Sequence, residues 1–361
     1  MIKYSKENGP WLFYRMPSDL RWGTDRETWI LDWARQWKAD AIIGRWNDEK
    51  VGLLSQLNIP IVLQNNKSRS DTYSNLTGDY EGTGQLAAQF FQKKLFTDYA
   101  FFGIKKVIWS EERGRGFKKE VERIGGRFYS FEMDPLKESE MRGDVGAWLH
   151  SLPKPVALFC CDDAHALYIT ETCKLENIQI PSEISLLGVD NDDLFCGISD
   201  PPISSIELDV ERGGYMTCKL LHQMIEESSK EPFNVVINPI RIKQRQSTEK
   251  HNIKDPYVSR ILRFIDDNYS SDLSVDSIVD IVPLSRRSVE MRFKKVMGTS
   301  IYQYLVCFRI ELLAQYLITT DRPLLDLAYE VGLKDGSNIS RIFKKYKGCS
   351  PLEYRQKYCV F

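Results

Sequence analysis

The chain has 361 residues, of which 42% are hydrophobic and 27% are charged, and its formal net charge is −1. This length suggests two or three globular domains, and the composition excludes a fibrous or disordered protein. No apolar run approaches the roughly 18 residues that span a bilayer, and the N-terminus lacks the apolar core of a signal peptide. The eight cysteines form no CxxC pair and the four histidines form no ligand pattern. We therefore expect a cytoplasmic protein with reduced thiols, no metal and no cofactor.

Short β-rich runs alternate with amphipathic helical stretches in residues 1–246. This alternation predicts an α/β fold with a parallel, doubly wound sheet, and the length fits two such lobes. The expected strands are Trp11–Arg15, Asp40–Gly44, Ile59–Leu63, Tyr99–Gly103, Arg127–Phe131, Val156–Cys160, Ile184–Val189, Ser204–Ile206 and Val235–Ile237. The clearest helices between them are Gly82–Lys94 and Asp144–Ser151.

Residues 247–256 are polar, end in Asp-Pro and predict an interdomain linker. The remaining residues, 257–361, predict an all-α domain. Its expected helices are Tyr257–Asn268, Ser274–Val282, Ser285–Val296, Ser300–Thr319, Leu324–Val331, Ser337–Lys345 and Pro351–Lys357.

A sequence repeat at an offset of fifty residues lies within this helical part. The residues Phe293, Lys294, Lys295, Gly298, Ser300 and Tyr304 recur as Phe343, Lys344, Lys345, Gly348, Ser350 and Tyr354. Each copy follows a short amphipathic segment and a turn, so the repeat predicts two helix-turn-helix units, at about 274–296 and 324–346. The helix between them spans about 20 residues, or roughly 30 Å. That length is close to the roughly 34 Å between successive major-groove faces of DNA.

Positive charge gathers in the two repeated helices. Residues 254–361 hold 17 Lys and Arg against 13 Asp and Glu, whereas the first 253 residues hold 32 against 37. Such a focus is the footprint expected for phosphate contact. The side chains expected to read base edges are Arg286, Arg287 and Glu290 in the first unit and Ser337, Asn338 and Arg341 in the second. Those expected to bind phosphate are Lys294, Lys295, Lys344 and Lys345, while Val289, Phe293, Ile339 and Phe343 are expected in the core.

Polar residues follow several of the strands expected in the first part. Cys161, Asp162 and Asp163 follow one strand, Asp190 and Asn191 follow the next, and Asp79 and Arg113 lie near helix starts. Ligands of doubly wound folds bind at the carboxyl ends of strands. Carboxylates and arginine suit a neutral polyhydroxyl ligand, with Trp109 as a candidate stacking surface. Each of Asp79, Asp162 and Asp163 could equally serve as a helix N-cap.

The helical part resembles the AraC-type transcription regulators. The resemblance rests on PLSRRSVEMRFKKVMGTS and VGLKDGSNISRIFKKYKGCSPLEYR, which together cover about 100 residues. The chain departs from the pattern at Pro283, where the first turn usually has glycine, and at Ile339, where the second recognition helix usually has an aromatic residue. These departures bear on the details of turn geometry.

The first part resembles the LacI-type sugar-binding module through GDYEGTGQLAAQFF, RGRGFKKEV, LFCCDDAHAL and SLLGVDNDDL. The fusion of the two looks like the regulators of xylose operons. The resemblance implies ligand contacts from Asp79, Arg113, Asp163, Asp190 and Asn191, with Asp79 on one lobe and Asp163 and Asp190 on the other. The module's opening strand is missing, since Met1–Gly9 looks like the end of its first helix, which suggests a truncated chain.

The expected function is therefore sequence-specific transcription regulation under the control of a sugar, such as the pentose D-xylose, bound between the lobes. The expected partners are operator DNA, the sugar, RNA polymerase and a second copy of the chain, with no membrane. A regulator of another carbohydrate operon is the nearest alternative. AraC-like readers are also fused to DNA-repair alkyltransferases, for which Cys160 and Cys161 would be the candidate nucleophiles, and a transport binding protein would explain the first part alone.

Overall fold

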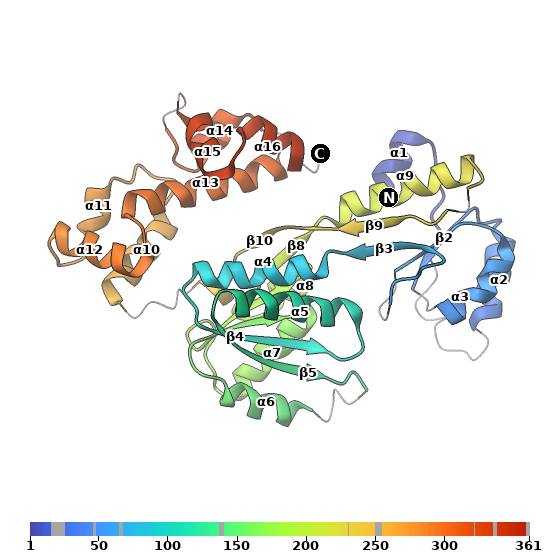
Figure 1. Ribbon diagram of the computed structural model, residues 1–361, viewed down its shortest axis with the longest axis horizontal. Helices are drawn as coiled ribbons and strands as arrows, with labels where there is room; N and C mark the ends of the chain where they lie inside the picture. Colours follow the sequence, from blue (N-terminus) through green and yellow to red (C-terminus); the bar gives the residue numbers. More distant parts are fainter. Residues whose placement is uncertain are drawn as a thin grey trace. The chain divides into compact units, whose positions relative to one another are not determined.

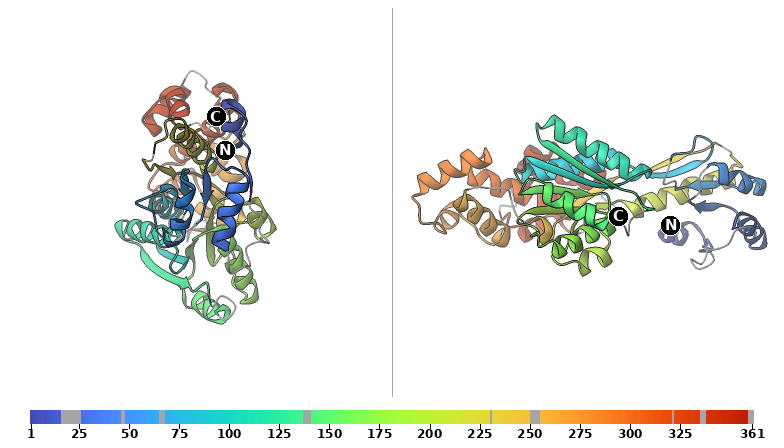
Figure 2. Two further views of the ribbon diagram at one scale, coloured as in Figure 1. Left: turned by 90° about the vertical axis from the view of Figure 1, so that its right-hand side faces the viewer. Right: turned by 90° about the horizontal axis from the view of Figure 1, so that it is seen from below.

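The structure is a computed structural model that describes residues 1–15, 26–45, 48–64, 68–136, 141–229, 231–249, 255–320, 322–334 and 338–358. It divides into two compact units, Met1–Lys250 and His251–Phe361. Figures 1 and 2 show strands and helices in the first unit and helices alone in the second. This confirms the expected order of an α/β domain followed by an all-α domain.

The first unit begins with a lobe built on a four-stranded parallel sheet. Its order is β1 (Ile42–Gly44), β2 (Ile61–Leu63), β3 (Ser74–Gly78), β9 (Asn234–Ile237). Side chains alternate along β2, so Ile61 and Leu63 pack against α2 (Arg26–Gln36) and α3 (Asp48–Leu54), while Val62 packs toward Leu221 of α9 (Val210–Glu226). The short helices α1 (Ile2–Asn8) and η2 (Ser55–Leu57) complete the described lobe.

The second lobe holds a six-stranded sheet with helices on both faces. Its order is β10 (Pro239–Lys243), β8 (Ser204–Leu208), β7 (Ile184–Val189), β6 (Val156–Cys160), β4 (Asp98–Ile104), β5 (Arg127–Met133), and only the β10–β8 pair is antiparallel. One face packs on α4 (Tyr80–Lys93) and α5 (Ile108–Arg123), which lie side by side (Figure 1). The other packs on α6 (Arg142–Ser151), α7 (Asp163–Leu175) and α8 (Asp193–Ile198).

The chain passes between the lobes at three points, after β3, after β8 and after β9. Asp79 and Asp209 stand at the first two, and each caps the helix that follows. Their backbone N–H groups donate to the carbonyl oxygens of Ile237 and Asn238, both at 2.9 Å. The crossovers are therefore bonded to one another, and the candidate ligand residue Asp79 belongs to this junction.

The glycine and serine positions of the repeat end one helix and begin the next. Gly298 and Gly348 end α12 (Arg286–Met297) and α15 (Ile339–Lys347) in the left-handed conformation, with φ of 69° and 79°. Ser300 and Ser350 then cap α13 (Ile301–Thr319) and α16 (Pro351–Tyr358).

Aromatic pairs close both copies of the repeat. Phe293 meets the edge of Tyr304 at 5.7 Å between ring centroids, and Phe343 meets Tyr354 at 5.3 Å. The remaining helices are α10 (Pro256–Asn268), α11 (Val275–Val279) and α14 (Leu324–Glu330).

The expected strands differ from the observed ones at three places. Residues 11–15 form no strand, whereas β3 and β10 were not predicted. β3 contains the buried polar residue Asn75, whose amide bonds to the Ser70 N–H, to the Ser70 and Tyr73 carbonyls and to the Asn234 side chain. Such satisfied polar residues hide a buried strand from any hydrophobicity pattern. β10 begins at Pro239 and carries two charged residues, Arg241 and Lys243, as is typical of an edge strand.

The predicted start of the linker, at residue 247, lies too early in the chain. The segment Gln246–Thr248 forms a 3-10 helix, η3, in which Ser247 and Thr248 are fully buried. The Ser247 hydroxyl donates to the carbonyl of Leu186, and Ser204 bonds to both residues. Residues 247 and 248 therefore belong to the second lobe, and residues 250–254 of the expected linker lie outside the described part of the chain.

Candidate ligand site and DNA interface

Asp163 lies at the start of α7, and its buried carboxylate meets the loop after β7 and the start of β8. It accepts hydrogen bonds from the Ser205 hydroxyl at 2.6 Å and from the Asp192 N–H at 2.8 Å. Burial raises the pKa of Asp163 to about 7 despite these donors. The residue predicted as a ligand contact therefore also ties three strand ends together.

Arg113 of α5 is buried beside these loops. Its guanidinium donates to the Cys161 carbonyl at 2.5 Å and to the Asp190 carboxylate at 3.4 Å. The same group lies over the rings of Trp109 and Tyr80, with 5.3 Å and 5.6 Å to the centroids. Among the described residues, the Arg113 Nε–H is buried without a hydrogen-bond partner. Buried donors are seldom left unpaired, so this atom is a candidate contact for a ligand.

Asp190 and Asn191 directly follow β7 in a strained loop. Their φ angles are 103° and 52°, in a region that residues with side chains rarely adopt. The Asp190 side chain is 49% exposed, which leaves its carboxylate accessible while Arg113 holds one oxygen. The Asn191 N–H donates to the Ser205 hydroxyl, and its side-chain oxygen accepts from Arg245 at 2.8 Å.

Four of the five predicted ligand contacts form two connected pairs. Arg113 bonds directly to Asp190, and Asp163 and Asn191 both bond to the Ser205 hydroxyl. Asp79 is different, because its carboxylate accepts from the Gly82 N–H at 2.9 Å as the N-cap of α4. The expectation that Asp79 lies on the opposite lobe stays a prediction, since Asp79 stands at the crossover: its backbone N–H bonds to Ile237 at the end of β9, while α4 packs on the six-stranded sheet. Within the described residues no hydrogen bond or ion pair joins it to the other four.

Close packing of α4 on α5 sets the position of Arg113. A Cβ at Gly84 would lie 2.1 Å from the Arg113 carbonyl oxygen, and one at Gly116 would lie 2.1 Å from the Glu81 carbonyl oxygen. Glycine is needed at both points because the two backbones approach too closely for any side chain.

Sequence reasoning missed Ser205 and Arg245. Ser205 carries the fully buried hydroxyl that serves Asp163 and Asn191, and a polar Ser-Ser pair within an expected strand was the available signal. Arg245 follows β10 and bonds to the Ile203 carbonyl, to Asn191 and to Asp193. No local sequence pattern reveals that role, because its partners lie more than 40 residues away.

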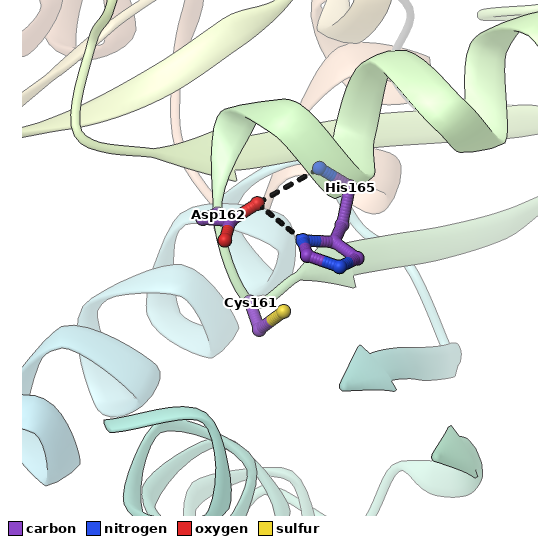
Figure 3. A group of neighbouring side chains, drawn as sticks. All are labelled: Cys161, Asp162 and His165. Atoms are coloured by element: carbon purple, nitrogen blue, oxygen red, sulfur yellow. Dashed lines mark hydrogen bonds and ion pairs between the residues drawn. The ribbon is translucent and has the colours of Figure 1, made fainter. Parts of the chain in front are cut away.

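Cys161, Asp162 and His165 form a group whose potential metal ligand atoms lie within 4.8 Å of one another (Figure 3). One Asp162 oxygen accepts from both the His165 backbone N–H at 2.8 Å and its ring Nδ1 at 2.7 Å. Burial opposes ionisation of Asp162, but these bonds hold its pKa below the usual value. Asp162 is therefore the N-cap of α7, as the alternative interpretation expected.

The thiols of Cys160 and Cys161 are fully buried, and burial raises the pKa of both well above the usual value. A cysteine nucleophile or metal ligand acts as the thiolate, which this environment suppresses. The geometry therefore disfavours the alkyltransferase alternative and supports a structural role for both residues.

The first DNA-binding candidate is α12, whose buried side is Val289 and Phe293. Arg287, Lys294 and Lys295 are exposed on it. Arg286 is instead bound to the carboxylates of Asp276 and Glu290, so two of the predicted base readers pair with each other. Among the described residues Arg287 has no ion-pair partner, which leaves it the available arginine at the start of this helix.

The second candidate is α15, which buries Ile339 and Phe343 and exposes Arg341, Lys344 and Lys345. Asn338 is half-buried at its N-cap position. Ser337, the equivalent of Arg287 in the repeat, lies outside the described residues. Both helices therefore present basic side chains opposite a buried aromatic and aliphatic pair.

Known proteins match both parts of the chain. Residues 88–248 match the periplasmic binding protein-like domain family, and residues 278–357 match a helix-turn-helix domain family. The Xylose operon regulatory protein of Escherichia coli (strain K12) is 25% identical over 336 residues, which cover 90% of this chain and 86% of that protein. Its counterpart from Haemophilus influenzae is 27% identical over 342 residues, covering 92% and 88%.

A solved structure of the xylose-binding transcription activator xylR aligns with a TM-score of 0.55 at 21% identity, covering 96% of this chain and 97% of that one. Among the described residues, no helix combines the length and apolar character needed to cross a membrane. The chain therefore carries a periplasmic binding protein-like domain followed by a helix-turn-helix domain, and in this order it is similar to transcription regulators over about nine tenths of its length.

Proposed function

We propose that this regulator binds a sugar between the lobes of its sensor and that the sugar changes its affinity for operator DNA. The observation that carries the proposal is the buried Arg113, whose Nε–H has no hydrogen-bond partner among the described residues and whose neighbour Asp190 is half-exposed. The N–H can donate to, and the carboxylate can accept from, the hydroxyl groups of one small neutral molecule. Trp109 and Tyr80 supply flat apolar faces at the same place.

We infer a pentose, with D-xylose as the first candidate. The relatives that cover about nine tenths of this chain carry the name Xylose operon regulatory protein, and this supports xylose. The Melibiose operon regulatory protein of Escherichia coli matches only 33% of this chain, so it supports its own sugar less than the relatives of nearly full coverage support xylose. Titration calorimetry against a panel of pentoses and hexoses tests the sugar. Binding of another sugar alone would make the chain the regulator of a different carbohydrate operon.

For DNA binding, we propose that Arg287, Asn338 and Arg341 read bases. The lysines in the last turn of each recognition helix bind phosphate, and these are Lys294, Lys295, Lys344 and Lys345. Arg286 and Glu290 hold each other, so their contribution is to fix the start of α12. We also propose a base contact for Ser337, because it occupies the position in the repeat that corresponds to Arg287. A homodimer would present four recognition helices, and contact with RNA polymerase would convert binding into regulation.

The first prediction separates base reading from phosphate binding. Arg287→Ala should weaken binding to the cognate duplex by about 1–3 kcal/mol and relax discrimination at one position, because arginine can bond guanine at two atoms. Lys344→Ala should weaken binding to all duplexes alike, and the slope of log K against log salt concentration should become smaller in magnitude by about 1. Fluorescence anisotropy with cognate and scrambled duplexes at several salt concentrations measures both. Equal losses on both duplexes for both variants would refute the division.

The second prediction concerns the sugar contact. Asp190→Ala should weaken sugar binding by about 10- to 100-fold, as expected for a lost hydrogen bond to a charged group. Asp200→Ala is the matched control, since Asp200 is an exposed carboxylate whose recorded partner is Lys174. Calorimetry of both variants gives the comparison, and an Asp190 variant with undiminished sugar affinity would remove this residue from the site.

The third prediction follows from the raised pKa of Asp163. Its value of about 7, against an ordinary 3.8, means that the folded chain retains a proton which the unfolded chain releases between these values. The contribution to stability is present at low pH and is lost as the pH rises toward 7 and above, at up to about 1.4 kcal/mol per pH unit.

Asp163→Asn cannot titrate at this position, so its stability should fall less than that of the wild type between pH 5 and pH 8. Urea unfolding at each pH measures the difference between the two proteins. Parallel curves would show that the folded carboxyl has an ordinary pKa.

The fourth prediction addresses how the sugar signal leaves the sensor. Arg245 bonds to Asn191 in the candidate ligand loop and lies two residues before the buried Ser247 that precedes the linker. Arg245→Met should therefore reduce the factor by which sugar changes DNA affinity, typically 5- to 150-fold, toward unity while sugar still binds. Arg241→Met is the control, because Arg241 lies on β10, just before Arg245, but is paired with Glu207. The ratio of DNA affinities with and without sugar gives the result, and an unchanged ratio for Arg245→Met would exclude this route.

A further inference from the structure

Arg309 lies in the middle of α13, the helix between the two helix-turn-helix units, and its side chain is buried. Its Nε donates to the carbonyl of Tyr269 at 2.9 Å, and one Nη donates to the carbonyl of Ser271 at 2.8 Å. Tyr269 is the C-cap of α10, where carbonyl groups carry partial negative charge. Within the described residues Arg309 makes no ion pair, so these carbonyls hold a buried cation.

The turn of the second unit packs on the same place. Gly332, between α14 and α15, has a φ of 82°, and a Cβ there would lie 2.5 Å from the Tyr269 carbonyl oxygen and 2.8 Å from the Arg309 guanidinium. The same two segments are also joined by an ion pair, with 3.0 Å between Lys334 Nζ and Asp272 Oδ2. Three segments therefore meet: the end of α10, which packs with the first helix-turn-helix unit, the middle of α13, and the turn that follows α14. We call residues 269–272, Arg309 and residues 332–334 the inter-unit joint.

The joint connects the two recognition helices by short paths. The end of α10 packs with α12 in one core, which contains Ile265, Val289 and Phe293. Gly332 stands before α15, whose Ile339 and Phe343 belong to a separate core. The two cores share the length of α13, and the joint adds a second fixed connection between them. A single helix could bend or twist between two cores, whereas two connections determine both spacing and rotation.

We propose that Arg309 is a positioning residue that fixes the second recognition helix relative to the first, so that both engage one DNA duplex as a unit. This inference rests on the proposed DNA-binding function, and it goes beyond it because Arg309 is buried and reads no DNA itself. When two readers are held at a fixed distance, the second binds at a high effective concentration. Loss of the joint removes that advantage without altering either reader.

The test uses the full chain and a duplex that the wild-type chain selects from a random DNA pool, with footprinting to locate its two halves. Three duplexes are compared: the selected one, one with the second half scrambled, and one with three base pairs inserted between the halves. The variants are Arg309→Met, Arg309→Lys and Gly332→Ala, which disturbs the joint from the other side. Arg263→Met, an exposed arginine on α10, is the control.

We expect the wild type and the control to lose at least 10-fold in affinity when the second half is scrambled or displaced. Arg309→Met and Gly332→Ala should bind the scrambled duplex as the wild type does, but should gain less than 3-fold from the second half. Arg309→Lys should lie between them, since an ammonium group keeps the charge but lacks the fork that reaches two carbonyls.

Three results would overturn the inference. Equal losses on all duplexes for Arg309→Met and Gly332→Ala would mean that the joint supports the fold of a single unit. Unchanged affinities on all duplexes would mean that α13 alone sets the spacing. A wild-type chain that enriches no DNA from the pool would instead overturn the proposed function itself, and that result is recognised before any variant is made.

Discussion

The sensor is organised around one electrostatic constraint, the burial of Arg113 next to the ends of two strands. A buried guanidinium needs acceptors, and it finds them in the Cys161 carbonyl and in Asp190, on the loops after β6 and β7. Its backbone is held by α5 packing on α4 without side chains at Gly84 and Gly116. The two loops, the two helices and the rings of Trp109 and Tyr80 thus all contact the same residue, whose buried Nε–H has no hydrogen-bond partner among the described residues.

A second layer of polar bonds connects this place to the end of the sensor. Asp163 and Asn191 share the Ser205 hydroxyl, and Asn191 also bonds to Arg245. The chain then enters η3, where Ser247 is bonded to β7. Hydrogen bonds therefore connect the loop after β7 to the last described residues of the sensor. Buried polar networks of this kind respond to small displacements because each member has few alternative partners.

The helical DNA-binding domain is built differently, because one short sequence pattern occurs in it twice. In each copy an aromatic pair, a left-handed glycine and a serine cap turn a recognition helix into the next helix. Repetition alone gives two similar readers but does not say how they are related in space. That relation comes from α13 and from the joint around Arg309, where a carbonyl-bound cation and a close-packed glycine bring distant segments together.

The sequence by itself determined the order of the domains, most strands of the second lobe, and every helix of the DNA-binding domain, because alternation, caps and the repeat are local patterns. It also named Arg113, Asp163, Asp190 and Asn191, through their places after strands and a family resemblance. Tertiary structure decided what no local pattern carries. It made β3 a buried strand by satisfying Asn75, turned residues 247 and 248 from linker into core, and placed Asp79 at the crossover. It also gave Ser205, Arg245 and Arg309 their roles. In each case the deciding bond joins residues distant in sequence, and the free energy of burying a polar group depends on whether that partner is present.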